Sequence, residues 1–215
     1  MKIGVKKQVL LWIVAAVPLI MTAAVNPRLP EIIPIHWNIK GEVDGTAARF
    51  PGAFLLPAIS LGVVALMLFI PRMDPRRENY KKFGGAYYWF MVALAGFFAV
   101  MDATILLISL GADLRVDYIM KLLVGVLTII IGLIMPRLEH NYFIGIRTPW
   151  TYNSEKVWRA THRHGGRIWP AAGLAMCVLS FIPGAISAYV YFVLIAAAAI
   201  EPAVYSYIKY NKDIK

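Results

Sequence analysis

The sequence has few charged residues and a single cysteine. Only 16% of its 215 residues are charged, whereas roughly 25% are charged in a typical soluble domain. The lone cysteine, Cys177, lies inside an apolar run and cannot form an intrachain disulfide. The sequence also has no internal repeat and no low-complexity segment. These absences argue against a soluble domain, a repeat protein and a disulfide-framed secreted fold.

Long apolar runs account for most of the chain. Hydrophobic residues make up 60% of it, and several runs reach or approach the ~20 residues that cross a bilayer core. We expect one all-α integral membrane domain over residues 1–215, with six transmembrane helices arranged as antiparallel hairpins. The predicted spans are 8–25, 52–71, 87–111, 118–135, 167–182 and 185–208.

The first apolar run could instead be a signal peptide, since it follows Lys2, Lys6 and Lys7. From Gln8 to Val25 it is longer than the ~7–15 apolar residues of a signal core. We therefore expect a retained first helix.

The distribution of cations predicts the orientation. Seventeen Lys and Arg residues lie in the N-terminus, the second and fourth loops and the C-terminus, and four lie in the opposite segments. Because cations are enriched on the cytoplasmic side, we expect a multi-pass protein of the bacterial plasma membrane with both termini cytoplasmic. The net charge of +10 then indicates contact with membrane lipid, and we expect no direct binding of nucleic acid.

The segment 26–51 is predicted to be an extracellular cap loop. Pro30 and Pro34 disfavour a helix, residues 35–40 alternate as a strand does, and Gly41 and Asp44-Gly45 signal turns. We expect an extended or β-hairpin-like cap that either contacts a ligand or toxin or simply fixes the first two helices. Its candidate contact residues are Pro34, His36, Trp37, Asn38, Gly41 and Asp44.

The segment 136–166 is predicted to be a cytoplasmic loop and carries the densest set of polar residues. Gly145 permits a tight turn, and Ser154 with Glu155 predicts the start of a short amphipathic helix ending near residue 164. We expect this helix to lie at the membrane interface, anchored by Trp158. The loop could anchor the structure or dock a cytoplasmic partner, and its candidate residues are Asn141, Gly145, Arg147, Thr148, Trp150, Thr151, Ser154, Trp158 and His162.

Three ionisable residues fall within the predicted spans: Asp102, Lys121 and Glu201. Such groups are costly in a membrane and usually face protein or water. Lys121 could pair with Asp102 or extend outward, and Glu201 could meet Arg167 or the cytoplasmic loop. These groups could form an ion path, but satisfied pairs that fix the helix register explain them as well.

No enzyme motif is recognisable. His36 with Glu31 and Asp44, or Glu139 with His140, His162 and His164, could suggest a metal or acid–base site, but neither set has a metal-binding spacing. There is no phosphate-binding glycine loop and no serine elbow. We expect no catalytic residue, no metal and no cofactor.

Two segments resemble a known family. The run from His140 to Thr151, with Gly145-Ile-Arg-Thr-Pro-Trp-Thr at its centre, is similar to the signature of the SdpI immunity-protein family, and Ser154, Trp158 and His162 continue the likeness. The segment from Leu29 to Asn38, with Gly41 and Asp44-Gly45, resembles the small domain of unknown function that often precedes this signature.

The resemblance implies a non-enzymatic protein that protects a bacterium from a secreted, SdpC-like peptide toxin. It also implies a signalling role, in which the protein holds a soluble ArsR-type autorepressor at the membrane when toxin is present. The alternative from the residues themselves is a small ion-coupled transporter or exporter that uses Asp102, Lys121 and Glu201.

Overall fold

The structure is a computed structural model that describes residues 4–214. Lys2 and Lys215, which were counted among the predicted cytoplasmic cations, lie outside the described residues.

Six long helices and one β-hairpin form the described part of the chain. The long helices are α1 (Val5–Val25), α2 (Arg49–Met73), α3 (Tyr80–Ser109), α4 (Val116–Ile134), α6 (Glu155–Ser180) and α7 (Ala185–Ile214). A five-residue helix, α5 (Pro149–Asn153), precedes α6, and three single 3₁₀ turns follow α1, precede α3 and follow α4. Each of the six predicted spans corresponds to one of the long helices.

Five of the long helices are long and apolar enough to cross a membrane: α1, α2, α3, α4 and α7. Helix α6 is long enough, but its first half carries Glu155, Lys156, Arg159 and Arg163. The prediction of a sixth span therefore depends on the apolar second half of α6, after Arg167, and stays a prediction.

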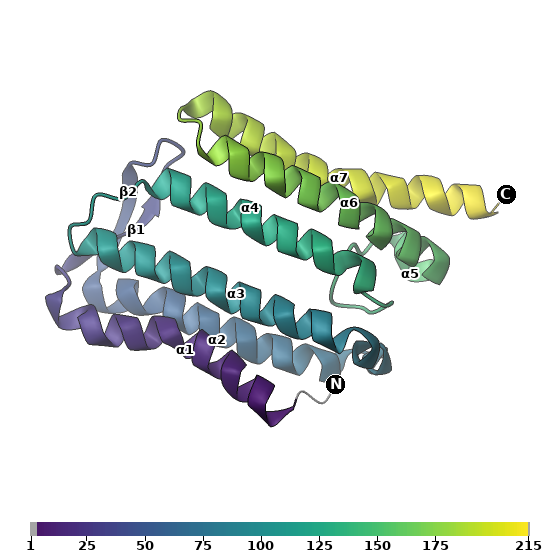
Figure 1. Cartoon of the computed structure of the whole chain (residues 1–215), viewed down its shortest axis with the longest axis horizontal. Coiled ribbons are helices and arrows are strands. Elements are labelled where there is room, and N and C mark those ends of the chain that lie inside the picture. Colours follow the sequence, from purple (N-terminus) through teal and green to yellow (C-terminus); the bar gives the residue numbers. More distant parts are fainter. Residues whose placement is uncertain (1–3, 215) are drawn as a thin grey trace.

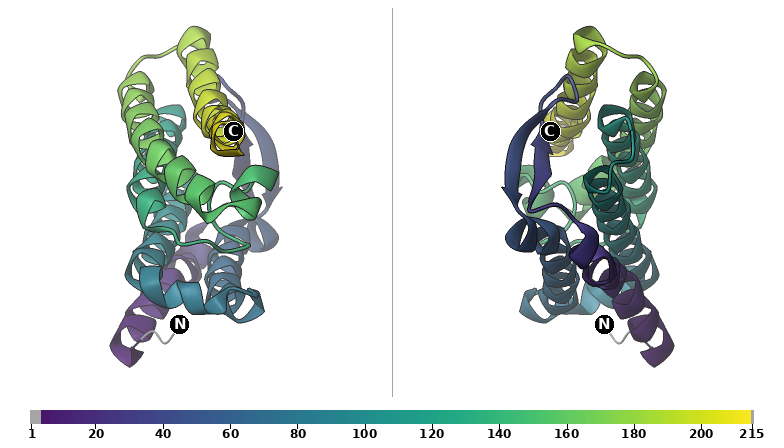
Figure 2. Two further views of the ribbon diagram at one scale, coloured as in Figure 1. Left: turned by 90° about the vertical axis from the view of Figure 1, so that its right-hand side faces the viewer. Right: turned by 90° about the vertical axis from the view of Figure 1, so that its left-hand side faces the viewer.

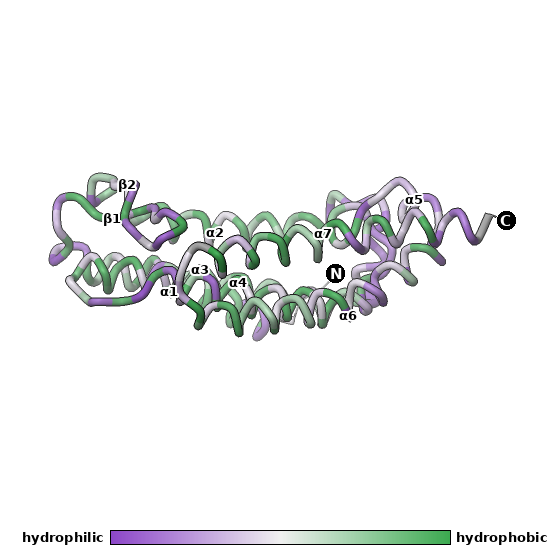
Figure 3. The backbone as a smooth tube through the Cα atoms, turned by 90° about the horizontal axis from the view of Figure 1, so that it is seen from above, coloured by the Kyte–Doolittle hydropathy of each residue, from purple (hydrophilic) through white to green (hydrophobic). Residues whose placement is uncertain are grey.

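The helices form two groups of three. Helices α1, α2 and α3 pack against one another, and α4 packs closely against α6, which packs against α7. The groups meet mainly where α3 contacts α4. Figures 1 and 2 show the helices running along the long axis, with the hairpin at one end and α5 at the other. Seen from above, α2 and α7 lie in one row and α1, α3, α4 and α6 in the other (Figure 3).

Small residues set the distance between α4 and α6. A Cβ atom added at Gly132 would lie 2.4 Å from Pro170 Cδ, and one at Gly125 would lie 2.8 Å from Cys177 Sγ. The two backbones can therefore approach closely only because these positions carry no side chain.

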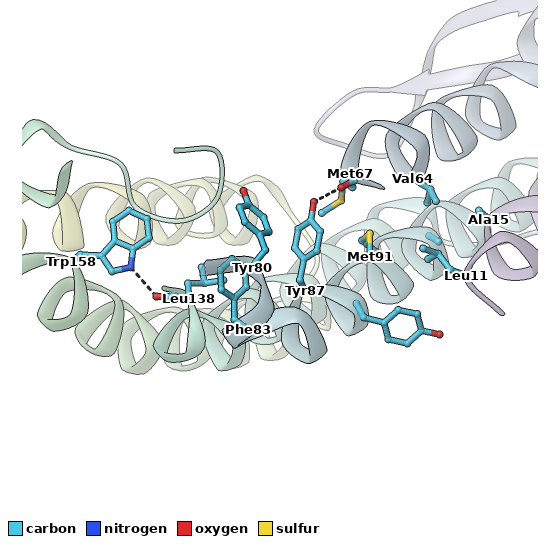
Figure 4. Packing of buried hydrophobic residues seen from close by; sticks show 12 residues of the cluster. Leu11, Ala15, Val64, Met67, Tyr80, Phe83, Tyr87, Met91, Leu138 and Trp158 are labelled. Carbon is cyan, nitrogen blue, oxygen red and sulfur yellow. Dashed lines mark hydrogen bonds between the residues drawn. The ribbon is translucent and has the colours of Figure 1, made fainter. Parts of the chain in front are cut away.

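The largest buried cluster runs along the first group of helices and reaches the signature loop (residues 136–166) (Figure 4). Tyr87, buried in α3, donates a hydrogen bond of 2.6 Å to the Met67 carbonyl of α2. At the other end, the indole N–H of Trp158 donates to the Leu138 carbonyl at 2.8 Å. The loop is therefore part of the hydrophobic core and not an appendage to it.

The short amphipathic helix predicted over residues 155–164 is wrong in its extent. Ser154 caps the helix as predicted, because its Oγ accepts from the Val157 N–H at 3.3 Å. The helix then continues without a break to Ser180. Gly165 and Gly166 do not end it, because both pack tightly against the turn after α4, where an added Cβ would meet Met135 or Pro136.

The predicted hairpin is confirmed. Strands β1 (Ile32–Trp37) and β2 (Val43–Ala48) pair antiparallel, but the register shifts on both sides of His36. The predicted alternation from residue 35 to 40 is therefore wrong, because an irregularity in the ladder re-aims the side chains beyond it. Ile33, outside the predicted alternation, is the strand residue that is fully buried.

Candidate functional site

The signature loop is organised around the Asn141 side chain, which is fully buried. Its Oδ1 accepts from the backbone N–H groups of Phe143 and Ile144, at 2.9 and 2.7 Å. Its Nδ2 donates to the carbonyls of Glu139 and Ile144, both at 3.0 Å. One amide therefore replaces the backbone pairing that an irregular loop lacks.

Asp74 connects this loop to the first group of helices. The carboxylate lies just after α2 and is 2% exposed. It accepts from the Arg76 N–H at 2.7 Å, from the Tyr142 N–H at 2.9 Å and from the Tyr80 hydroxyl at 3.0 Å. Asn79 adds a bond of 2.7 Å from its Nδ2 to the His140 carbonyl. The loop is thus fixed to α2 and α3.

His162 fixes the middle of the loop to α6. Its Nε2 accepts from the Ile146 N–H at 2.9 Å, so the neutral ring carries its proton on Nδ1, which donates to the Trp158 carbonyl at 2.8 Å. Burial lowers the pKa of His162 to about 4. The hydrogen bond to the Trp158 carbonyl raises this pKa, and the neighbouring His140 lowers it. The ring is therefore a neutral structural link at pH 7.

The Thr-Pro-Trp-Thr run begins α5 and connects it to α7. Thr148 is the N-cap: its Oγ1 accepts from the Thr151 N–H at 3.2 Å, and the Thr148 N–H donates to Thr151 Oγ1 at 2.9 Å. The Thr148 hydroxyl also shares a hydrogen bond of 2.9 Å with Ser206 of α7. The rings of Trp150 and Tyr207 lie 4.9 Å apart between the same two helices. With the bonds of Asp74 and Asn79, the signature loop therefore joins both groups of helices.

The prediction that Trp158 anchors a helix at the membrane interface is wrong. Trp158 is fully buried, and its ring is stacked between those of His140 and His162, with centroids 4.9 and 4.0 Å away. Val157 and Thr161 on the same face are also fully buried. This face of α6 packs on residues 138–151 of the signature loop, because these residues follow α4 directly and fold back over α6.

Only a few signature residues remain at the surface. Arg147 is exposed, and its Nη1 donates a 3.2 Å hydrogen bond to the Tyr142 carbonyl. Arg76 lies over the Tyr142 ring at 5.0 Å, and Tyr142 stacks on Tyr152 at 5.4 Å. These four side chains form one cationic and aromatic surface, here called the Arg147 surface.

At the opposite end, the hairpin is stabilised by its own polar residues. Asn38 Oδ1 accepts from the Lys40 and Glu42 N–H groups at 2.8 and 3.1 Å, while His36 and Asp44 are 2.5 Å apart across the strands. Gly41 turns the chain with a φ of 82°. Of the predicted contact residues, His36, Trp37, Asn38 and Gly41 line a cavity of about 600 Å³ beneath the hairpin, whereas Pro34 and Asp44 do not.

The three ionisable residues of the predicted spans have separate neighbours. Asp102 accepts from the Thr22 hydroxyl of α1 at 3.1 Å, and Glu201 bonds His164 of α6 at 2.7 Å, as one of the two predictions for it allowed. Of the two alternatives for Lys121, the pair with Asp102 does not form. Lys121 lies 4.0 Å from Asp117, one turn earlier on the same helix, whereas Asp102 faces α1.

Among residues 4–214, no three His, Cys, Asp or Glu side chains gather closely enough to hold a metal ion. Cys177 is a free thiol that packs between α6 and α4.

Two segments of the chain match known protein families or domains. Residues 137–206 match the SdpI/YfhL protein family, and residues 13–61 match a domain of unknown function. The chain is therefore similar to the SdpI/YfhL family over its C-terminal part. It is 29% identical to "Immunity protein SdpI" of Bacillus subtilis (strain 168) over 208 residues, which are 96% of this chain and 97% of the relative. No solved structure gives a significant match.

The family match begins at Arg137 and ends at Ser206, so it covers nearly all of the signature loop, the rest of α6 and most of α7. Sequence reasoning identified the motif but missed its partners Asp74, Tyr80 and Ser206. No local spacing connects them to the loop, although Asp74 is conspicuous as an acidic residue just before the cations Arg76 and Arg77. Asp117 could have been found, because it precedes Lys121 by four positions on a predicted helix.

Proposed function

We propose that this chain is a non-enzymatic immunity protein that protects a bacterium from a secreted, SdpC-like peptide toxin. The observation that carries the proposal is the likeness to "Immunity protein SdpI" along almost the whole of both chains. In this proposal the chain crosses the plasma membrane six times, with both termini cytoplasmic. The 17-to-4 division of cations supports that orientation.

The two patterned segments would act on opposite sides of the membrane. The hairpin would meet the toxin outside. The Arg147 surface would dock a cytoplasmic partner, such as an ArsR-type autorepressor, inside. The structure supports this division because the hairpin and the signature loop lie at opposite ends of the same bundle (Figure 1). A toxin and a repressor could then influence each other through two states of the bundle, each preferred by one ligand.

The first test is survival. A toxin-sensitive bacterium that expresses this protein is challenged with the SdpC-type peptide and compared with one that carries an empty vector. Increased survival is expected. No increase, with the protein demonstrated in the membrane, would contradict immunity to this toxin.

Arg147→Ala tests the cytoplasmic surface in the same assay. The variant loses one hydrogen bond at an exposed site, so the protein should stay folded. Arg137→Ala is a matched control, because Arg137 is also exposed and donates one bond of 2.9 Å to a backbone carbonyl, that of Leu133. Loss of protection by Arg147→Ala alone is expected. Full protection by both variants would show that Arg147 is not needed for protection.

The alternative is an ion-coupled transporter that uses Asp102, Lys121 and Glu201. It has less support, because these three groups do not face one another: their nearest polar neighbours are Thr22, Asp117 and His164 respectively. Transporter helices are also usually broken at the binding site, whereas α3, α4 and α7 run unbroken through these positions.

A further inference from the structure

The cavity beneath the hairpin has two chemically different parts. Most of its wall is apolar and comes from α2, α3, α4 and α7, with Leu56, Met101, Ile105, Met120 and Val124 among the lining residues. Its polar part lies at the hairpin end, where Asp117 lies against Gly41 of the turn and Lys121 follows one helical turn later in α4. A ligand that fits must therefore be apolar along its length and polar at one end.

The cavity opens sideways and not only toward the hairpin end. Helices α2 and α7 both line it, yet they are not among the closely packed helix pairs of the described chain. Leu55 on α2 is 51% exposed and Phe192 on α7 is 59% exposed, although both line the cavity. Since both helices are apolar enough to cross a membrane, this opening faces the bilayer, and a lipid can enter without crossing water.

The charges at the polar end favour an anionic group. The Asp117 carboxylate lies 3.3 Å from Arg115 and 4.0 Å from Lys121, so two cations share one carboxylate. His36, which also lines the cavity, is already paired with Asp44. Asp117 lies closer to Arg115, outside the lining, than to Lys121, so the charge of Lys121 is only partly compensated.

Lys121 is therefore the cation that a ligand in this cavity would meet. Its side chain is 13% exposed, and the Asp117 oxygen at 4.0 Å is beyond hydrogen-bond distance. Within residues 4–214, no acceptor forms a hydrogen bond with its ammonium group. The backbone at Lys121 is fixed, because its carbonyl accepts a 2.6 Å hydrogen bond from the Tyr191 hydroxyl of α7. A half-buried ammonium with unused donors can bind a phosphate oxygen.

We propose that this cavity binds one anionic phospholipid, with an acyl chain among the apolar side chains and the headgroup phosphate on Lys121. A lipid is favoured over a peptide because the opening faces the bilayer and the charge lies at one end of an apolar cavity. With the orientation proposed above, the lipid belongs to the outer leaflet. The site does not depend on the immunity function.

The test is native mass spectrometry of the full chain, purified in detergent and mixed with phosphatidylglycerol and phosphatidylcholine of identical acyl chains. The wild type should retain one phosphatidylglycerol with about fivefold preference, the size of effect expected for one cation near a lipid headgroup. Lys121→Gln should remove the preference, and Lys121→Arg should keep it. Lys82→Gln, at an exposed cation outside the cavity lining, should leave it unchanged.

A second pair of variants tests the cavity itself. Val124→Trp fills it and should abolish lipid retention, whereas Val126→Trp, on the exposed side of the same helix and outside the lining, should not. Met101→Phe is a smaller obstruction that serves if Val124→Trp does not fold. Equal retention of both lipids by the wild type would overturn the proposal. It would indicate that the cavity binds a neutral apolar ligand, such as a peptide segment. Undiminished preference in Lys121→Gln would also overturn it.

Discussion

Gly145 lies directly against the imidazole of His162. The glycine has a φ of 109°, and a Cβ atom there would lie 2.2 Å from His162 Nε2. That nitrogen already accepts the hydrogen bond from Ile146. The signature glycine is therefore required twice, once by its backbone conformation and once by its neighbour.

Gly145→Ala is expected to unfold the signature loop. Backbone strain at such a φ costs about 1–2 kcal/mol, and the clash with a buried ring adds to it. Gly111→Ala separates the two effects, because Gly111 has a φ of 95° and a Cβ atom added there would meet no atom within 4 Å. Thermal unfolding in detergent should show a much larger loss for Gly145→Ala. Equal losses would mean that the contact with His162 is unimportant.

Asn141→Ala is expected to destabilise the protein by about 3 kcal/mol or more. The substitution leaves the buried N–H groups of Phe143 and Ile144 without their acceptor, and an unsatisfied buried group costs about 1–3 kcal/mol. Asn153→Ala, at an exposed position nearby, should change stability by less than about 0.5 kcal/mol. Amide hydrogen exchange is the direct measurement: faster exchange at residues 143 and 144 is expected in Asn141→Ala alone.

The stability of the protein should fall on acidification because of His162. Its pKa is lowered to about 4 in the folded state, against about 6.5 in an unfolded chain. The unfolded state therefore binds a proton first, and the stabilisation, complete above about pH 6.5, is lost as pH falls toward 4. The full effect is on the order of 3 kcal/mol.

Melting temperatures of the wild type and His162→Gln between pH 7.5 and 4.5 measure this effect. The variant should be less stable at pH 7.5 and should depend less on pH. A parallel pH dependence in both proteins would assign the acid sensitivity to another group, of which His140 is the first candidate, because burial lowers its pKa as well.

Local patterns predicted the elements of this fold better than their contacts. Pro34 and Gly41 predicted the hairpin and its turn, and apolar run length predicted the long helices. The other predicted turn, at Asp44-Gly45, is wrong, because both residues lie within β2. The irregularity beside His36 was not predictable, because it depends on the pairing of β1 with β2 and not on either strand alone. The helix end predicted near residue 164 is also wrong, because Gly165 and Gly166 pack against the turn after α4 and α6 continues through them.

The role of the signature motif was the hardest feature to predict. Asn141, Thr148, Trp158 and His162 are conspicuous polar or aromatic residues in a loop, and such residues suggest a binding surface. In the structure all four are buried, and the loop is bonded to segments more than fifty positions away through partners such as Asp74, Tyr80 and Ser206. Arg147 remains as the exposed charge of the motif, which is why the functional test depends on it.

Asp102→Asn and Glu201→Gln separate the immunity and transporter functions. Both substitutions remove a charge but keep a group that can hydrogen-bond Thr22 or His164, so the helix contacts should persist. If protection does not use an ion path, both variants should protect the toxin-challenged bacterium as well as the wild type does. Loss of protection in either variant, with normal amounts of protein in the membrane, would instead favour ion-coupled transport. The retained hydrogen bonds make that outcome informative, because a change in activity would follow from the lost charge and not from a broken helix contact.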